Sequence, residues 1–143
     1  PYHAIDDGRW AGKRLGARVV NSYVFKSILE KGGHLAFGSD WTVAPIDPIL
    51  GIYAAVTRRT LDGKNPGGWI PEQKITVDQA LRAYTTGNAY GVFAEAHRGR
   101  LVTGARADLV LLDQDLFSIA PEAIETTQIR ATVAGGKVVY RNL

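Results

Sequence analysis

The sequence predicts an α/β protein that changes near residue 95, from helices alternating with a buried strand to strands alone. Before residue 40, a helical pattern, a glycine turn and a short apolar run follow one another, as at the end of an α/β repeat. After Gly99, the chain is rich in Val, Ile, Leu and Thr, and apolar residues alternate with polar ones, which is typical of strands.

The first helix is expected after a stretch, residues 1–20, whose turn and charge signals outweigh any periodicity. Asn21 or Ser22 can cap this helix, and apolar residues recur after them at helical spacing. Gly32 and the glycine after it end the helix. The run 34–37 is short, apolar and bounded by glycine, so we expect a buried strand there.

A second helix is expected to begin at Asp47, because an aspartate cap followed by proline is a common helix start. One apolar face recurs at helical spacing, formed by Ile49, Ile52, Tyr53 and Val56. Residues 61–69 are dense in Asp, Asn, Pro and Gly, which favours a loop.

Thr76 and Gln79 make a capping box for a third helix, and Asn88 is expected to open a short helix through Phe93. Strands are expected over 100–104, 107–113 and 129–141. In the last of these ranges, two adjacent glycines at 135 and 136 predict a hairpin turn.

The composition is that of a soluble globular domain, with 45% hydrophobic and 22% charged residues. No apolar stretch approaches the roughly 20 residues of a membrane span, so we expect a cytoplasmic protein without a membrane partner. The absence of cysteine excludes disulfides and thiolate zinc sites. Net charge is +3, but the basic residues of 9–18 alternate with apolar ones, which favours a solvated face over nucleic-acid binding.

Asp40 directly follows the expected buried strand, and two interpretations of it remain open. A Ser-Asp pair after a strand is often a plain turn or a helix cap. In a closed α/β barrel, however, the residues at the C-terminal ends of the strands line the active site. A carboxylate there can accept a proton from an attacking water.

The chain carries five motifs in one order: FGSDW (37–41), DPILGIYAAVTR (47–58), ITVDQALRAYTTGNAYGVF (75–93), GRLVTGARADLVLLD (99–113) and TVAGGKVVY (132–140). In this order they closely resemble the C-terminal part of the metal-dependent amidohydrolases, especially the branch labelled amidohydrolase 3 or YtcJ-like. The opening PYH is similar to the segment after the seventh barrel strand of that branch. The resemblance covers nearly the whole chain.

The family fold is a (β/α)8 TIM-like barrel with a small β-sandwich built from both ends of the chain. The resemblance therefore implies that residues 1–95 are the C-terminal part of the barrel, with 34–39 as its eighth strand. Residues 96–143 would then be strands of the composite sandwich.

The resemblance also implies a chemistry, namely hydrolysis of non-peptide carbon–nitrogen bonds in small amide-like molecules. In the intact parent, a divalent metal, with zinc as the expected ion, would be contacted by Asp40, which would also be the catalytic proton acceptor. His3, Trp41 and Arg58 are the candidate substrate-binding residues. Alternatives stay open for each: a surface or capping histidine, a packed rim aromatic, and a helix-end arginine beside a carboxyl.

Most metal ligands of the family have no counterpart in this chain. The family uses a His-x-His pair and further single histidines, whereas none of the three histidines here, His3, His34 and His97, matches a ligand position. We expect His34 and His97 to be structural. A catalytic metal needs about three protein ligands, and a barrel takes roughly 250 residues. The chain is therefore expected to be a fragment that binds no metal and is inactive alone.

A non-catalytic interaction or oligomerisation module is the alternative function. An orphaned barrel edge that exposes Leu35 and Phe37 would self-associate or pair with the missing N-terminal barrel half. A basic nucleic-acid binder ranks below both interpretations.

Overall fold

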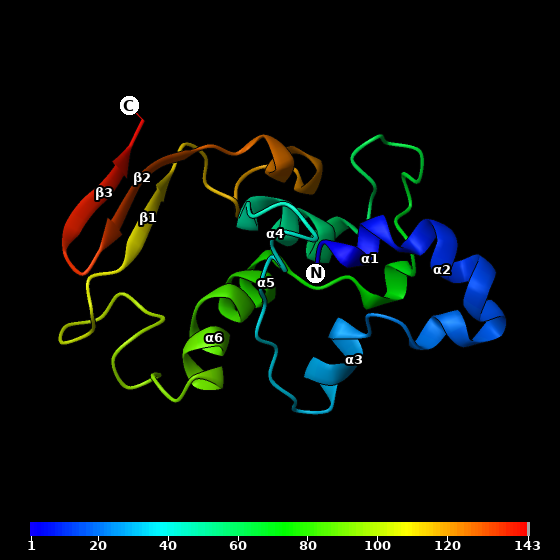
Figure 1. Cartoon of the computed structure of the whole chain (residues 1–143), viewed down its shortest axis with the longest axis horizontal. Coiled ribbons are helices and arrows are strands. Elements are labelled where there is room, and N and C mark those ends of the chain that lie inside the picture. Colours follow the sequence, from blue (N-terminus) through cyan, green and yellow to red (C-terminus); the bar gives the residue numbers. More distant parts are fainter. Residues whose placement is uncertain (143) are drawn as a thin grey trace.

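The computed structural model describes residues 1–142, with helices packed together over most of the chain and a sheet at its C-terminal end (Figure 1). The α-helices are α1 (His3–Asp6), α2 (Gly8–Leu15), α3 (Phe25–Glu30), α4 (Pro48–Thr57), α5 (Val77–Tyr84) and α6 (Thr86–Gly91). Three 3₁₀ helices are also present: Gly16–Asn21 and Pro71–Gln73 among the α-helices, and Pro121–Thr126 between the first two strands of the sheet. The fold is thus a mixture of helices and one antiparallel sheet.

The first twenty residues are helical, so the prediction of a turn-rich segment was wrong. Ala4 and Ile5 in α1 and Ala11 in α2 are buried, and this packing outweighs the weak local periodicity. A Cβ atom at Gly8 would lie 2.6 Å from the ring of Trp69, so α2 can approach this ring only through a glycine.

The helix predicted after Asn21 or Ser22 begins later than expected. Residues Gly16–Asn21 form a 3₁₀ helix, and α3 starts at Phe25 with Val24 as a cap that makes no side-chain hydrogen bond. The glycine stop was confirmed, since the N–H groups of Gly32 and Gly33 close the last turn on helix carbonyls.

Residues 34–39 are extended but form no strand, because no other strand of the described chain lies beside them. Helices hold this segment instead. The N–H of Phe37 donates to the carbonyl of Ala83 at 3.0 Å, and the Asn88 amide donates to the carbonyl of Phe37 at 2.8 Å. Phe37 is buried between the rings of Phe25 and Tyr84, so the expectation that its side chain would be exposed was wrong.

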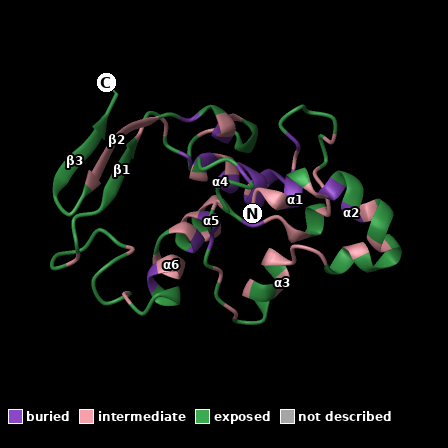
Figure 2. Cartoon of the chain, in the orientation of Figure 1, coloured by how far each residue is buried: buried purple, intermediate pink, exposed green. Residues whose placement is uncertain are grey.

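Helix α4 forms the centre of the helical region (Figure 2). The predicted start was confirmed, because Asp47 accepts a hydrogen bond from the N–H of Ile49 at 2.9 Å and Pro48 is the first helical residue. The helix is buried on nearly every side by the residues Ile49, Gly51, Ile52, Tyr53, Ala54, Ala55 and Thr57. A helix that is apolar all round belongs in the core, which is where α4 lies.

The capping box of α5 was confirmed: the Thr76 hydroxyl accepts from the Gln79 N–H, and the Gln79 side chain accepts from the Thr76 N–H. Helix α6 begins at Thr86 rather than at Asn88. Asn88 instead uses its amide to reach the carbonyls of Phe37 and Tyr84.

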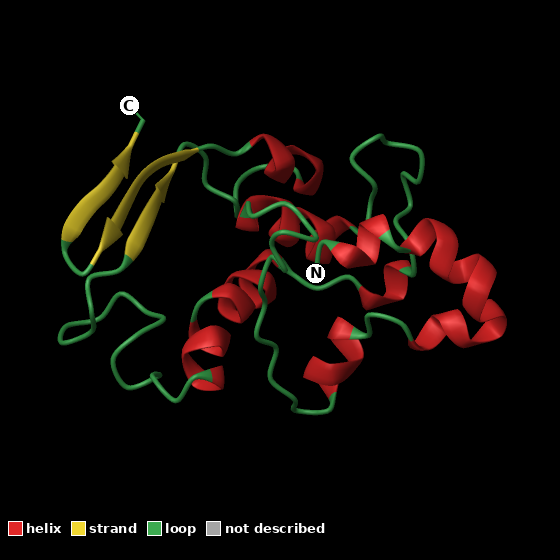
Figure 3. Cartoon of the chain, viewed as in Figure 1, coloured by secondary structure: helices red, strands yellow, loops and turns green. Residues whose placement is uncertain are grey.

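The sheet contains β1 (Leu109–Leu112), β2 (Ile129–Ala134) and β3 (Lys137–Arg141) in the order β1-β2-β3, all antiparallel (Figure 3). Ala134 pairs with Lys137 across the two glycines, which have φ values of 57° and 79°. Positive φ at both positions is what a tight hairpin of this type requires, so the predicted turn was confirmed. The expected strand at 100–104 is a loop in the structure.

The described part of the chain has neither the closed barrel nor the sandwich, since its strands are limited to these three. Its longest helix, α4, has 10 residues, and none of the helices within residues 1–142 has the length and apolarity to cross a membrane.

Replacing Thr76 with alanine removes the hydroxyl that closes the first turn of α5. We expect the free energy of unfolding to fall by about 1 kcal/mol, measured from urea unfolding followed by circular dichroism. Thr103→Ala, in an exposed loop, is the matched control and should change it by less than about 0.5 kcal/mol. If the free energy of unfolding falls equally in the two variants, the Thr76 hydroxyl does not stabilise α5 as its cap.

Candidate functional site

The structure brings together two of the residues expected at the site, His3 and Asp40. The Nε2 atom of His3, in α1, lies 3.0 Å from Oδ2 of Asp40, although 37 residues separate them. Asp40 has a φ of 58°, in the left-handed region that aspartate tolerates better than most residues. Its carbonyl accepts hydrogen bonds from the N–H groups of Val43 and Ala44, which fixes the turn.

The two partners differ in exposure. The side chain of Asp40 is 67% exposed, whereas that of His3 is 24% exposed. A half-buried imidazole thus holds one oxygen of a carboxylate whose other oxygen is free to meet solvent, a metal or a substrate. Such a carboxylate can accept a proton from a water within hydrogen-bond reach.

Asp7 lies on the other side of the His3 ring. Its Oδ2 atom is 3.8 Å from Nδ1 of His3, one helical turn away along the chain. The hydroxyl of Tyr23 donates to the same Asp7 oxygen at 2.6 Å. Burial, this hydrogen bond and the charge of Asp7 together raise the pKa of Tyr23 to about 12.

Arg58 holds the backbone around Tyr23. It ends α4 in a left-handed conformation, and its side chain is completely buried. Its Nε donates to the carbonyl of Trp69 at 2.8 Å and its Nη1 to the carbonyl of Tyr23 at 2.9 Å. The guanidinium also lies 5.4 Å from the ring centres of both Phe25 and Trp69.

The observed contacts of Arg58 are therefore with backbone carbonyls and aromatic rings. Burial lowers the pKa of its guanidinium, which nonetheless stays protonated because arginine does not lose its proton in proteins. Its Nη2 atom is buried without a hydrogen-bond partner within residues 1–142. The expected contact of Arg58 with substrate stays a prediction.

Trp41 follows Asp40 and is 65% exposed. Val43 and Ile46, in the same loop, are also largely exposed, so the loop after Asp40 carries an exposed apolar rim. The backbone N–H of Trp41 donates to the Ser39 hydroxyl at 3.3 Å.

The other two histidines lie away from Asp40. The His34 ring stacks on Tyr90 with 4.5 Å between ring centres, beside a cavity of about 360 Å³. The backbone carbonyl of His97 accepts a hydrogen bond from the N–H of Arg106. The ring contact of His34 is a packing contact, and the structural roles expected for both residues stay predictions.

A metal site cannot be assembled from the described residues. Residues 1–142 contain no group of three or more His, Asp or Glu side chains placed to hold a metal ion. Asp40 and His3 supply at most two ligands and also bond to each other, whereas a catalytic metal normally has about three protein ligands and an open position.

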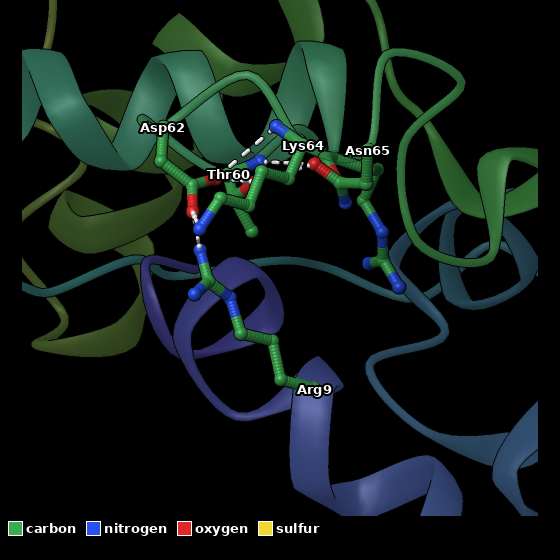
Figure 4. Close-up of polar contacts among 6 residues, drawn as sticks. Arg9, Thr60, Asp62, Lys64 and Asn65 are labelled. Carbon is green, nitrogen blue, oxygen red and sulfur yellow. Dashed lines mark hydrogen bonds and ion pairs between the residues drawn. The ribbon is translucent and has the colours of Figure 1, made fainter.

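The loop after Arg58 is ordered by its own side chains (Figure 4). The hydroxyl of Thr60 donates to Asp62, and Asn65 accepts from the N–H of Thr60. Arg9, in α2, lies 2.7 Å from Asp62 and ties the loop to the helix that follows Asp7. The hydroxyl of Thr60, the backbone N–H of Lys64 and Arg9 hold the pKa of Asp62 well below its usual range.

Two residues of this site were not found by sequence reasoning. Asp7 could have been found from the sequence, because it lies four residues after His3 and side chains at this spacing meet on one face of a helix. Tyr23 could not have been found from the sequence, because its contact with Asp7 depends on how α2 and the 3₁₀ helix after it turn the chain back.

Comparison with known proteins gives a family match and several relatives, among them the Arabidopsis thaliana protein LONG AFTER FAR-RED 3, which is 37% identical over 98% of this chain and 24% of its own length. Residues 1–140 match the model of the amidohydrolase family called Amidohydro_3. A Bacillus subtilis (strain 168) protein, YtcJ, which is named as an amidohydrolase, is 33% identical over 98% of this chain and 27% of its own length. The N-substituted formamide deformylase of Arthrobacter pascens is 29% identical over 92% of this chain and 23% of its own length.

A solved structure agrees with these matches. An uncharacterized metal-dependent hydrolase from Pyrococcus horikoshii OT3 superposes with a TM-score of 0.68 at 29% identity. The superposition covers 85% of this chain and 24% of that one. The chain thus spans about a quarter of the length of the relatives it matches.

Replacing Tyr23 with phenylalanine removes the hydroxyl that donates to Asp7. We expect a loss of about 1–3 kcal/mol in the free energy of unfolding at pH 8. Because the raised pKa of Tyr23 lies near 12, this contribution is complete below pH 10 and is lost as the pH rises through 12. Urea unfolding at several pH values tests this dependence.

The control for this variant is Tyr140→Phe, which changes an exposed phenol on β3. Its effect should stay below about 0.5 kcal/mol at every pH. If Tyr23→Phe does not lower the free energy of unfolding at pH 8, the hydroxyl does not stabilise the fold through Asp7. The same conclusion holds if the loss is as large near pH 12 as at pH 8.

Proposed function

Because the chain belongs to the amidohydrolase family, we propose that it is the C-terminal part of a metal-dependent hydrolase of non-peptide carbon–nitrogen bonds. The observation that carries the proposal is the Asp40 carboxylate, presented to solvent while His3 holds one of its oxygens. Three of the matching proteins have names that support the same chemistry: an amidohydrolase, a formamide deformylase and a metal-dependent hydrolase.

In this proposal Asp40 is the proton acceptor. Its exposed oxygen takes a proton from the attacking water and returns it to the leaving nitrogen, which departs as an amine. His3 donates through Nε2 to the other oxygen and so fixes the plane of the carboxylate. Asp40 is also one ligand of a divalent metal, with zinc as the proposed ion, and the remaining ligands come from sequence beyond this chain.

The proposed substrate is a small amide-like molecule that carries an apolar group. The exposed rim of the loop after Asp40, formed by Trp41, Val43 and Ile46, would contact that group. An N-substituted formamide fits this description, and the name of one relative supports that class. His3 would also lie within reach of the reacting amide. For Arg58, contact with substrate stays a proposal, and it requires the packing around the buried Nη2 atom to open.

The sheet supports the view that this chain works as part of a larger protein. Apolar side chains are exposed on its two edge strands, β1 and β3, at Leu109, Val110, Leu111, Val138, Val139 and Tyr140. A cavity of about 650 Å³ separates this sheet from α6 and is lined by apolar residues that include Ala89, Val92, Leu101, Leu109 and Val133. We propose that sequence beyond this chain covers both surfaces, and that residues 1–143 alone are inactive.

The exposed sheet also favours the second candidate function, a non-catalytic module that self-associates. An uncovered apolar edge strand of this kind promotes pairing between chains. The two candidate functions differ in the role of Asp40: it is catalytic in the hydrolase and has no role in the self-associating module.

Replacing Asp40 with asparagine keeps the size of the side chain and removes its basicity. In the longer protein that contains this chain, we expect kcat for hydrolysis of N-substituted formamides to fall by about 10²–10⁴-fold, measured as formate release. Asp78→Asn, an exposed carboxylate on α5 paired with Arg82, is the matched control and should leave kcat unchanged. A fully active Asp40→Asn enzyme would exclude the proposed role.

The proposed self-association through the sheet is tested by introducing a charge on the exposed surface of the sheet. We expect residues 1–143 to self-associate in light scattering, and Val139→Lys on β3 to shift the chain toward monomer because it charges the exposed edge. Val102→Lys, exposed in a loop outside the sheet, is the control. Monomeric wild-type chain at high concentration would argue against the module.

A further inference from the structure

Asp7 lies beside the His3 ring on the Nδ1 side, and Tyr23 contacts Asp7. The proposed hydrolysis does not by itself give either residue a role. His3 and Asp7 lie at the two ends of α1, whereas Asp40 lies in the turn after the extended segment 34–39. Oδ2 of Asp7 faces Nδ1 of His3, while Nε2 of the same ring faces Asp40. The imidazole therefore lies between two carboxylates, with Nε2 3.0 Å from Asp40 and Nδ1 3.8 Å from Asp7.

A histidine at the end of a short helix can turn about its side-chain bonds unless something limits it. On the Nδ1 side the Asp7 carboxylate lies 3.8 Å away, close enough for its charge to favour one orientation of the ring. Asp7 is itself held, because the Tyr23 hydroxyl donates to its Oδ2 atom at 2.6 Å and both side chains are partly buried. The carboxylate that faces His3 thus has one defined position.

The position of Tyr23 is fixed in turn. Its φ of 52° lies in the left-handed region, where a bulky aromatic residue is rare and costs energy to hold. Its carbonyl accepts from Nη1 of the buried Arg58, and its ring packs edge-on against Trp69 at 5.8 Å. A strained backbone held by a buried cation points this hydroxyl at Asp7.

We propose that Asp7 and Tyr23 are positioning residues of the proposed hydrolase: Tyr23 holds Asp7, and Asp7 keeps the His3 ring turned so that Nε2 stays on Asp40. This inference rests on the proposed function of Asp40. Neither residue touches the reacting atoms. Their effect is on the orientation of the Asp40 carboxylate, so losing them slows the chemical step and leaves substrate binding almost intact.

The first test uses Asp7→Asn and Tyr23→Phe in the longer protein, with N-substituted formamides as the probe. We expect kcat to fall roughly 10- to 100-fold, the range typical of residues that orient a catalytic group, with KM changed less than about twofold. Asp6→Asn is the matched control, because Asp6 is the adjacent carboxylate, exposed to solvent. Asp7→Glu, which keeps the charge, should recover part of the lost kcat.

The second readout needs no activity. In residues 1–143 labelled with ¹⁵N-histidine, the Nε2–H of His3 should give a slowly exchanging proton signal while it is held on Asp40. Asp7→Asn and Tyr23→Phe should broaden or remove this signal, and Asp6→Asn should not. Unfolding midpoints of the variants identify any that lose the fold.

The outcomes separate the two proposals. If Asp40→Asn abolishes hydrolysis while Asp7→Asn and Tyr23→Phe match Asp6→Asn in kcat, the positioning inference is overturned and the proposed function stands. If Asp40→Asn leaves hydrolysis unchanged, the proposed function fails. A His3 signal that is unaltered in the folded Asp7→Asn and Tyr23→Phe variants would also overturn the inference.

Discussion

The buried guanidinium of Arg58 joins three parts of the chain that are distant in sequence. It ends α4, donates to the carbonyl of Trp69 in the following loop, and donates to the carbonyl of Tyr23 before α3. A buried charge is tolerated only when hydrogen bonds and polarisable groups surround it, so these carbonyls and the two aromatic rings must stay in place. Through Tyr23, the same constraint reaches Asp7, then His3, and finally the carboxylate of Asp40.

The unpaired surfaces of the structure have one explanation in common. The extended segment 34–39 leads to Asp40 yet has no neighbouring strand within residues 1–142, and the sheet exposes apolar side chains on its edge strands β1 and β3. Both features are expected of a chain that spans about a quarter of its relatives' length. The helical half keeps its own core around α4, which lets it hold the Asp40 turn without the missing neighbours.

Elements with a local chemical signature could be predicted from the sequence. The Asp47–Pro48 start, the Thr76–Gln79 box and the paired glycines of the hairpin each satisfy backbone groups within a few residues, so local sequence decides them. Residues 1–20 could not be predicted, because their helices depend on burying Ile5 and Ala11 against distant segments. Likewise Asp40 and His3 were identified singly, whereas their meeting and the support from Tyr23 depend on tertiary packing.

The central claim is that Asp40 and His3 form one edge of a metal-dependent active site, which sequence beyond this chain completes. Elemental analysis of size-exclusion-purified protein tests it most directly, with residues 1–143 compared against the longer protein that contains them. The account predicts a stoichiometric divalent metal in the longer protein and only background metal in residues 1–143. Stoichiometric metal in residues 1–143, or none in the longer protein, would contradict it.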